Sequence, residues 1–136
     1  MGLHDKRVYH SAQAPQPIGP YSVGTGGGPF VFTAGQIGLD PQTGELVPGG
    51  IEAQTRQVFA NLQAILKAGG SCLQNTIKTT VYLMDMNDFA KMNAVYAEFF
   101  SGDYPVRTTV QVAGLPKKAL VEIDAIGVLC ADDSCC

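Results

Sequence analysis

The chain has 136 residues, of which 46% are hydrophobic and 15% charged, and its net charge at pH 7 is −3. This length suits one globular domain spanning residues 1–136, and the mild negative charge gives no basic footprint for nucleic acid. No segment reaches the roughly 18 apolar residues that a membrane-spanning helix needs, and the N-terminus lacks a signal-peptide core, so we expect a cytoplasmic protein without membrane contact.

Prolines and glycines interrupt regular secondary structure in the first third of the chain. A short strand is expected near residues 8–9, and three prolines keep residues 14–20 from forming a helix. The glycine-rich run 25–29 predicts a turn, and the apolar run 30–34 predicts a buried type of strand, so the two together indicate a hairpin. Further turn residues lie between 40 and 50.

Two helical patterns and one strand follow. Apolar residues recur with a 3.6-residue period over 51–69, and Gly69-Gly70 supplies a C-terminal stop. Residues 77–83 alternate between apolar and polar side chains and favour a strand. Acidic residues at 85–88 predict the start of a second helix. Its apolar face carries Phe89, Met92, Tyr96, Phe99 and Phe100, with the polar Asn93 on the same stripe.

Apolar residues in the last third of the chain predict two further strands, over 108–112 and 120–129. On the second strand, Glu122 and Asp124 share one face, which must therefore meet water, a ligand or a partner. The element order indicates an α+β fold, a single mixed β-sheet with two helices on one face. Because no element is left to cover the other face, we expect the chain to associate with copies of itself.

Cysteine and histidine usage limits the chemistry. Cys72 and Cys130 are expected to be small buried apolar residues, and the polar tail 131–136, which ends in two further cysteines, is expected to fray. Without a CxxC pair, no structural metal is predicted. The only histidines, His4 and His10, lie near the N-terminus, which argues against a Ser-His-Asp triad and against a two-histidine ribonuclease.

A small set of polar residues beside apolar strands remains for a site: Tyr21, Asn93, Arg107 and Glu122. Arginine is rarely buried without an anion, and Arg107 can bind a carboxylate through two parallel hydrogen bonds. Glu122 can take a proton from water or donate one. Residue types alone leave two interpretations open: Arg107 binds a ligand carboxylate, or it forms an internal salt bridge with Glu122.

Several motifs occur together, in order and with matching spacing, over about residues 7–129. They are Ile18-Gly19-Pro20-Tyr21-Ser22, Ala34-Gly35-Gln36-Ile37-Gly38, Lys78-Thr79-Thr80-Val81-Tyr82-Leu83, Asn93-Ala94-Val95-Tyr96, Pro105-Val106-Arg107, Leu115-Pro116-Lys117 and Val121-Glu122-Ile123. With these motifs the chain resembles the RidA/YjgF imine deaminase family, whose members are also named endoribonuclease L-PSP or translation inhibitor.

The resemblance implies a chorismate-mutase-like fold assembled as a homotrimer, with ligand clefts between subunits. It also implies metal-independent and cofactor-independent hydrolysis of 2-imino acids, such as 2-iminobutanoate and 2-iminopropanoate, to 2-keto acids and ammonia. By the same resemblance, Arg107 would hold the substrate carboxylate and Glu122 would position the attacking water. Tyr21, Gly35 and Asn93 would line the cleft, with the Gly35 N–H as a second donor to the carboxylate.

The chain departs from the family pattern at two positions. Ala34 stands where many members carry serine, and Thr109 stands where some carry cysteine. Neither change removes the arginine or the glutamate. Because fold alone does not confer activity, two other functions stay open: a non-catalytic trimeric module that binds small carboxylates or acts like a chaperone, and a ribonuclease or translation inhibitor.

Overall fold

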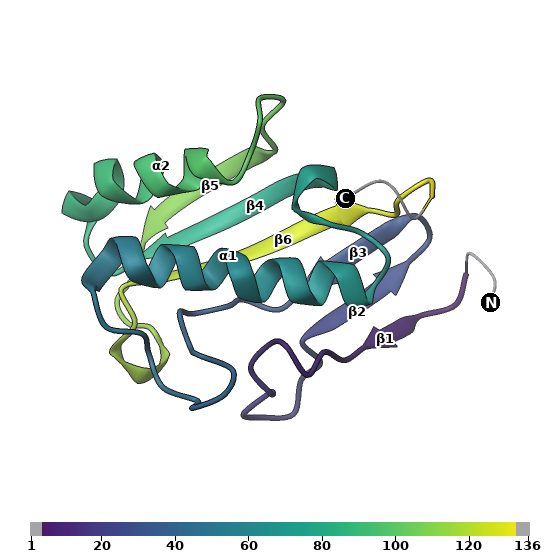
Figure 1. Cartoon of the computed structure of the whole chain (residues 1–136), viewed down its shortest axis with the longest axis horizontal. Helices are drawn as coiled ribbons and strands as arrows, with labels where there is room; N and C mark the ends of the chain where they lie inside the picture. Colours follow the sequence, from purple (N-terminus) through teal and green to yellow (C-terminus); the bar gives the residue numbers. More distant parts are fainter. Residues whose placement is uncertain (1–3, 133–136) are drawn as a thin grey trace.

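A computed structural model describes residues 4–132. One six-stranded sheet and two α-helices make up this part of the chain (Figure 1). The strands are β1 (Arg7–Tyr9), β2 (Gly24–Gly27), β3 (Phe30–Thr33), β4 (Thr76–Leu83), β5 (Val106–Gln111) and β6 (Val121–Val128). The helices are α1 (Gly50–Ala68) and α2 (Phe89–Glu98), with 3-10 turns η1 (Leu73–Asn75), η2 (Met86–Asp88) and η3 (Pro116–Lys118).

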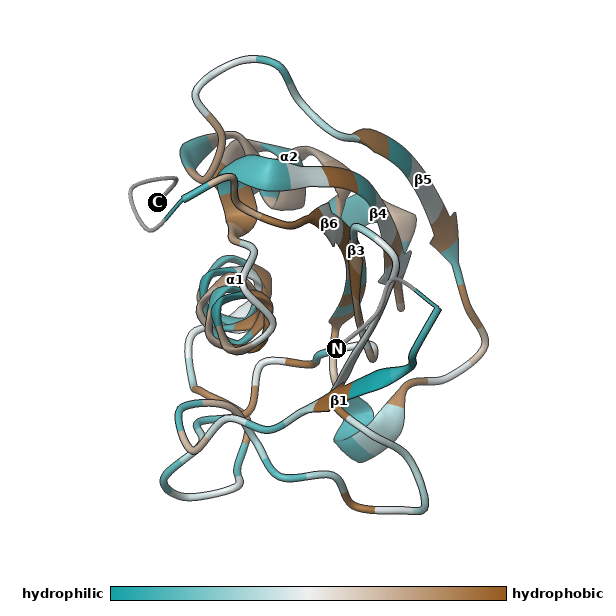
Figure 2. Cartoon of the chain, turned by 90° about the vertical axis from the view of Figure 1, so that its right-hand side faces the viewer, coloured by the Kyte–Doolittle hydropathy of each residue, from teal (hydrophilic) through white to brown (hydrophobic). Residues whose placement is uncertain are grey.

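The sheet is mixed, with strand order β1-β2-β3-β6-β4-β5. Neighbouring strands are antiparallel except β4 and β5, which run parallel and are joined through α2. Both helices lie on the same side of the sheet (Figure 2). The predicted α+β fold with two helices on one face is therefore confirmed. We call the uncovered side of the sheet the open face.

Helix α1 covers the middle of the sheet with the apolar stripe that the sequence predicts. Val58, Phe59, Leu62, Ile65 and Leu66 on this stripe are fully buried. The helix ends where the Gly69 N–H reaches back to the carbonyls of Ile65 and Leu66. Within residues 4–132, no helix has the length and apolar character needed to cross a membrane.

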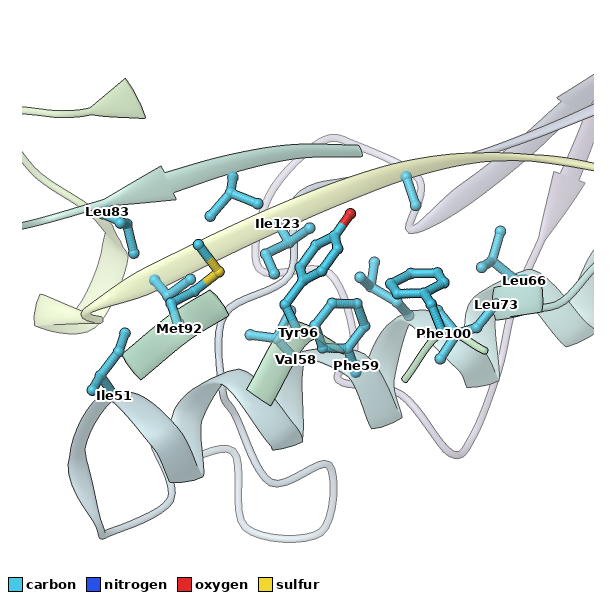
Figure 3. Close-up of a cluster of buried hydrophobic side chains, with 14 of the residues drawn as sticks. Ile51, Val58, Phe59, Leu66, Leu73, Leu83, Met92, Tyr96, Phe100 and Ile123 are labelled. Atoms are coloured by element: carbon cyan, nitrogen blue, oxygen red, sulfur yellow. The ribbon is translucent and has the colours of Figure 1, made fainter. Parts of the chain in front are cut away.

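An aromatic cluster joins both helices to the sheet (Figure 3). The ring of Phe59 stacks on Phe99 at a centroid distance of 4.6 Å and meets Tyr96 edge-on at 5.3 Å. The Tyr96 hydroxyl points toward the sheet and lies 2.7 Å from the Thr79 hydroxyl of β4. This hydrogen bond fixes α2 over the β4–β5 edge, where Arg107 lies.

The predicted turn at 25–29 is shorter than expected, because Gly24–Gly27 form strand β2 and only Gly28 and Pro29 turn the chain. The glycines allow close packing rather than a bend. A Cβ on Gly24 would come within 2.7 Å of Ile65, and one on Gly26 within 2.6 Å of the Tyr9 hydroxyl. The strand can lie against these neighbours only without side chains.

Strand β3 is less buried than its apolar sequence predicts. Val31 is fully buried, but Phe30 and Phe32 are 38% and 39% exposed. They alternate onto the open face, which no helix covers. Strand β5 also differs, since it begins at Val106 rather than at 108. Val106 is 68% exposed on the same face, so the predicted apolar open face is present.

The expectation for two cysteines is wrong in part. Cys72 is fully buried and Cys130 half-buried, but both are disulfide-bonded rather than free apolar side chains. Sequence spacing alone cannot show which cysteines approach each other in space. The predicted fraying of 131–136 falls largely on residues 133–136, outside the described part, while Ala131 and Asp132 form a bend.

Phe59 is the residue whose truncation should cost most in the core. Phe59→Ala should lower the free energy of unfolding by about 3–5 kcal/mol, because it removes the ring at the centre of the aromatic cluster. Phe59→Leu, which leaves a smaller cavity, should cost less. Urea unfolding at one fixed protein concentration measures both changes. A loss for Phe59→Ala no larger than that for Phe59→Leu would show that the cluster is not tightly packed.

Candidate functional site

Arg107 points toward the helices. It is the register partner of Thr79, which is buried on the helix side of β4, and alternation along β5 gives both residues the same face. The guanidinium carbon lies 4.7 Å from the centroid of the Tyr96 ring and 5.6 Å from that of Phe89. Two aromatic rings of α2 therefore hold the arginine side chain in place.

No carboxylate neutralises Arg107 within residues 4–132. The one ion pair in this range joins Arg56 to Glu98 on the surface, at 2.8 Å. Cation–π contacts of this kind contribute about 0.5–2 kcal/mol and leave the N–H donors of a guanidinium unused. Arg107 is thus fixed in direction but keeps its capacity to bind an anion.

Arg107 lines a hollow of about 280 Å³ between α2 and the start of β5, which we call the arginine hollow. Its other walls are Asn93, Tyr96, Ala97, Tyr104 and Pro105. The Oδ1 atom of Asn93 is buried and has no hydrogen-bond partner in the described part of the chain. Leaving such an acceptor unpaired costs about 1–3 kcal/mol, so a donor from outside the described residues would stabilise this side of the hollow.

Glu122 projects to the open face. Its neighbours Val121 and Ile123 are buried against the helices, so the half-buried Glu122 side chain points the other way. In the register of β4 and β6 it lies opposite Tyr82. Burial raises the pKa of the Glu122 carboxyl above its usual range, and the nearby charge of Asp124 raises that pKa further.

Gly35 brings a second backbone segment against Glu122. A Cβ at this position would overlap the Glu122 carboxylate, so only glycine leaves room for it. The amide of Ala34 bonds to Val23 at 2.8 Å and that of Gln36 to Ile123 at 2.9 Å. The Gly35 N–H between them makes no hydrogen bond to the described residues and stays available.

These groups border a smaller cavity of about 50 Å³, the glutamate hollow, lined by Tyr21, Gly35, Glu122 and neighbouring residues. Tyr21 is 48% exposed, and its hydroxyl accepts a hydrogen bond from the Ile18 N–H at 3.2 Å. This contact closes the proline-rich segment onto the tyrosine ring. The ring therefore stands at the mouth of the hollow.

The predicted site residues fall into two groups in a single chain. Arg107 and Asn93 line the arginine hollow on the helix side, whereas Tyr21, Gly35 and Glu122 line the glutamate hollow. Strand β4 separates β5 from β6, and the two charged side chains project from opposite faces. An internal Arg107–Glu122 salt bridge, left open by the sequence, is therefore absent from residues 4–132.

Sequence reasoning missed Asn61, which supports the glutamate hollow from α1. Its side-chain amide donates to the carbonyls of Ile37 and Leu39 at 3.2 and 3.0 Å, and its oxygen accepts from Gln57 at 2.9 Å. These bonds hold the segment after Gly35, which pairs with the sheet only at Gln36. The signal was available, since Asn61 is a polar residue directly before the buried Leu62.

The two departures from the family pattern lie beside the two hollows. Ala34 precedes Gly35, and its half-buried methyl group adds no donor there. Thr109 follows Arg107 by two residues on the helix side, and its buried hydroxyl lacks a partner among the described residues. Between His4 and Asp132, no group of three or more His, Cys, Asp or Glu side chains is placed to hold a metal ion.

Comparison with known proteins identifies the family. The family model for endoribonuclease L-PSP matches residues 11–129. The chain belongs to this family. A RutC family protein of Pyrococcus horikoshii is 57% identical over 89% of this chain and 96% of its own length. A mouse protein named 2-iminobutanoate/2-iminopropanoate deaminase is 46% identical, covering 90% of this chain and 91% of its own.

Solved structures of relatives agree with the fold. The crystal structure of E. coli TdcF with bound serine superimposes with a TM-score of 0.86 at 43% identity, covering 91% of this chain and 99% of TdcF. At this identity, membership in the L-PSP family and the shared fold rest on both sequence and structure. Members of this family include proteins named as imine deaminases.

Glycine at position 35 should be required for the position of Glu122. Gly35→Ala should displace the Glu122 carboxylate from the glutamate hollow while the fold is retained, because the new methyl group would occupy its place. Crystal structures of the variant and the wild type measure the displacement. Gly27→Ala is the matched control, since a Cβ there meets nothing within 4 Å. An unmoved Glu122 in Gly35→Ala would contradict the packing described above.

Proposed function

We propose that the protein hydrolyses reactive 2-imino acids, such as 2-iminobutanoate and 2-iminopropanoate, to 2-keto acids and ammonia. The observation that carries this proposal is the fixed but unneutralised Arg107, which faces a hollow large enough for a small ligand. Relatives at 43–46% identity that bear the name of this deaminase support the reaction class. The RutC relatives support membership in the family, but their names state no reaction.

In this proposal Arg107 binds the substrate carboxylate through two parallel hydrogen bonds. The free Gly35 N–H is a second donor to the same group. The Tyr21 ring and Asn93 form the walls of the cleft, and the unpaired Asn93 oxygen accepts a hydrogen bond from the ligand. Together these contacts would orient the imine carbon toward the attacking water. Holding two reactants in this way can supply a large part of the rate acceleration.

Glu122 would deliver the water. A protonated imine is already a strong electrophile, so the protein has to orient it and to remove a proton from the attacking water. The half-buried Glu122 carboxylate is the candidate base, and its raised pKa suits it to return that proton when ammonia leaves. None of the residues in this scheme requires a metal or an organic cofactor.

The scheme needs a second copy of the chain. Arg107 and Glu122 project from opposite sheet faces, so one subunit would supply the arginine hollow and its neighbour the glutamate hollow. The exposed apolar side chains Val106, Val110 and Phe32 give the open face the character of an interface. We propose a homotrimer with three such clefts between subunits.

Two alternatives stay in view. The serine bound to TdcF supports small-carboxylate binding, which a module without turnover would share. The name of the family model, endoribonuclease L-PSP, supports a ribonuclease function. The net charge of −3 argues against it, because RNA is itself negatively charged. A cytoplasmic location stays a prediction, and the disulfide-bonded Cys72 and Cys130 argue against it, because disulfides are rare in the cytosol.

Removing the arginine should abolish most of the activity. Arg107→Ala should lower kcat/KM for 2-iminobutanoate, generated in situ from threonine by a dehydratase, about 10- to 100-fold, because charge-assisted hydrogen bonds to the carboxylate are lost. The decay rate of the imine, corrected for the spontaneous reaction, is the measurement. Arg56→Ala is the matched control, since Arg56 pairs with Glu98 on the surface away from both hollows.

The outcomes separate the alternatives. A wild type that leaves the spontaneous rate unchanged would overturn the deaminase proposal. An active wild type whose Arg107→Ala variant keeps full activity would overturn the role of Arg107 alone. Cleavage of RNA that persists in Arg107→Ala after repeated purification would support a ribonuclease acting at another site.

The mass of the assembly in solution tests the proposed trimer. Light scattering of the purified protein should give three times the 14.4 kDa mass of the chain, because an open apolar sheet face is unstable in water. Val106→Glu places a charge on this face and should shift the mass toward that of the single chain. A monomeric wild type that still hydrolyses imines would contradict the intersubunit site.

A further inference from the structure

Two acidic side chains lie side by side on the open face of β6. Glu122 and Asp124 are two residues apart, so strand alternation gives them the same direction. Across the register of β4, Glu122 faces Tyr82 and Asp124 faces Thr80. Both acids are half-buried, although neither is paired with an arginine or lysine in the described part of the chain. The proposed reaction assigns a task to Glu122 and none to Asp124.

Asp124 accepts the hydrogen bond of a donor that the neighbouring strand β4 offers. The Tyr82 hydroxyl donates to Asp124 Oδ2 at 3.3 Å, even though the backbone of Tyr82 lies opposite Glu122. The hydroxyl is therefore bonded to Asp124 rather than to Glu122. Burial is the largest influence on Asp124 and raises its pKa, while hydrogen bonds from Tyr82 and Thr80 and the charge of Lys78 oppose this shift.

Apart from Asp124, the described residues bring no charge close enough to shift the pKa of Glu122. From β4, Tyr82 faces Glu122, and the charged Lys78 lies further along the same face, opposite Ile126. The segment on its other side contributes Gly35, which has no side chain, and the mouth of the hollow contributes the phenol of Tyr21. Asp124 is therefore the one charge among the described residues that shifts the pKa of Glu122, after the larger effect of burial.

We propose that Asp124 is a positioning residue for Glu122, keeping it ready, by its negative charge and by its hold on the Tyr82 hydroxyl, to take a proton from water and to return it. This inference rests on the proposed imine hydrolysis. Asp124 does not touch the substrate in this scheme. It acts through the neighbouring carboxylate, across a distance of two residues on one strand.

The reaction needs one group to serve twice. Water adds to the imine carbon as its proton passes to Glu122 and the C=N electron pair moves to nitrogen. Glu122 then returns that proton to the amine, the C–N bond breaks, and the O–H electron pair of the new hydroxyl forms the carbonyl. The hydroxyl proton leaves with ammonia as ammonium. A carboxyl performs both transfers best when its pKa lies near the operating pH. A neighbouring carboxylate raises that pKa, because two like charges repel each other.

A titration of Glu122 itself tests the inference. With glutamate labelled at the side-chain carboxyl carbon, the ¹³C signal of Glu122, assigned by its loss in Glu122→Gln, reports the pKa by NMR. Asp124→Asn keeps the size of the side chain but removes the charge, so the pKa of Glu122 should fall. Asp124→Glu keeps the charge and should leave a pKa above that of Asp124→Asn. Glu98→Gln, which removes a carboxylate on the far side of the sheet, should leave the pKa unchanged.

The activity profile provides a second readout. In Asp124→Asn the limb of kcat/KM that depends on Glu122 should move to lower pH, whereas a merely structural defect would lower the rate at all pH values equally. If Asp124→Asn does not fold, the wild type still decides, because coupled carboxyls must give the Glu122 signal a second inflection where Asp124 titrates.

The possible failures differ. An identical Glu122 titration in the wild type and Asp124→Asn, or a wild-type titration without the second inflection, would overturn the inference while imine hydrolysis by the wild type still stands. A wild type without imine hydrolysis would overturn the proposed function, and with it the role of Asp124 in proton transfer.

Discussion

The alternation of side chains along β5 and β6 sets the directions of the two charged groups at the candidate site. Arg107 projects to the helix side and Glu122 to the open face, and strand β4 lies between them. Backbone hydrogen bonds fix both directions, so no rotation of a side chain can bring the two charges into one pocket. In the proposed reaction the chain therefore carries two half-sites, and this geometry supports association of subunits as much as the exposed apolar residues do.

The two half-sites are prepared in different ways. In the arginine hollow, aromatic rings fix the direction of a permanent charge without neutralising it. In the glutamate hollow, burial and a second acid make a carboxylate hold its proton more tightly than usual. Both states cost free energy in a lone chain, since an unpaired cation and a half-buried acid are each better solvated by water. A ligand carboxylate and a bound water would relieve these costs together.

Periodicity in the sequence was enough to predict both helices and the strands over 77–83 and 120–129, because helix and strand patterns are local. The common face of the helices was predicted from the order of the elements. The open face also followed from counting elements. What the sequence could not supply were contacts between distant segments: the close approach that makes Gly24–Gly27 a strand, the disulfide bonding of Cys72 and Cys130, and the amide of Asn61 that holds the Gly35 segment. The separation of the site into two hollows also needed the register of β4 with both neighbours.

Mixing two impaired variants tests most directly whether the site spans two subunits. Chains of Arg107→Ala and Glu122→Gln, unfolded together in equal amounts and refolded, would form mixed trimers in which one cleft of three has both residues intact. Since about three in four trimers are mixed, activity should recover to about a quarter of that of the refolded wild type. Each variant refolded alone should keep only its own residual activity, which for Arg107→Ala is about 1–10% of the wild type. A mixture no more active than its components would contradict an intersubunit site formed by Arg107 and Glu122.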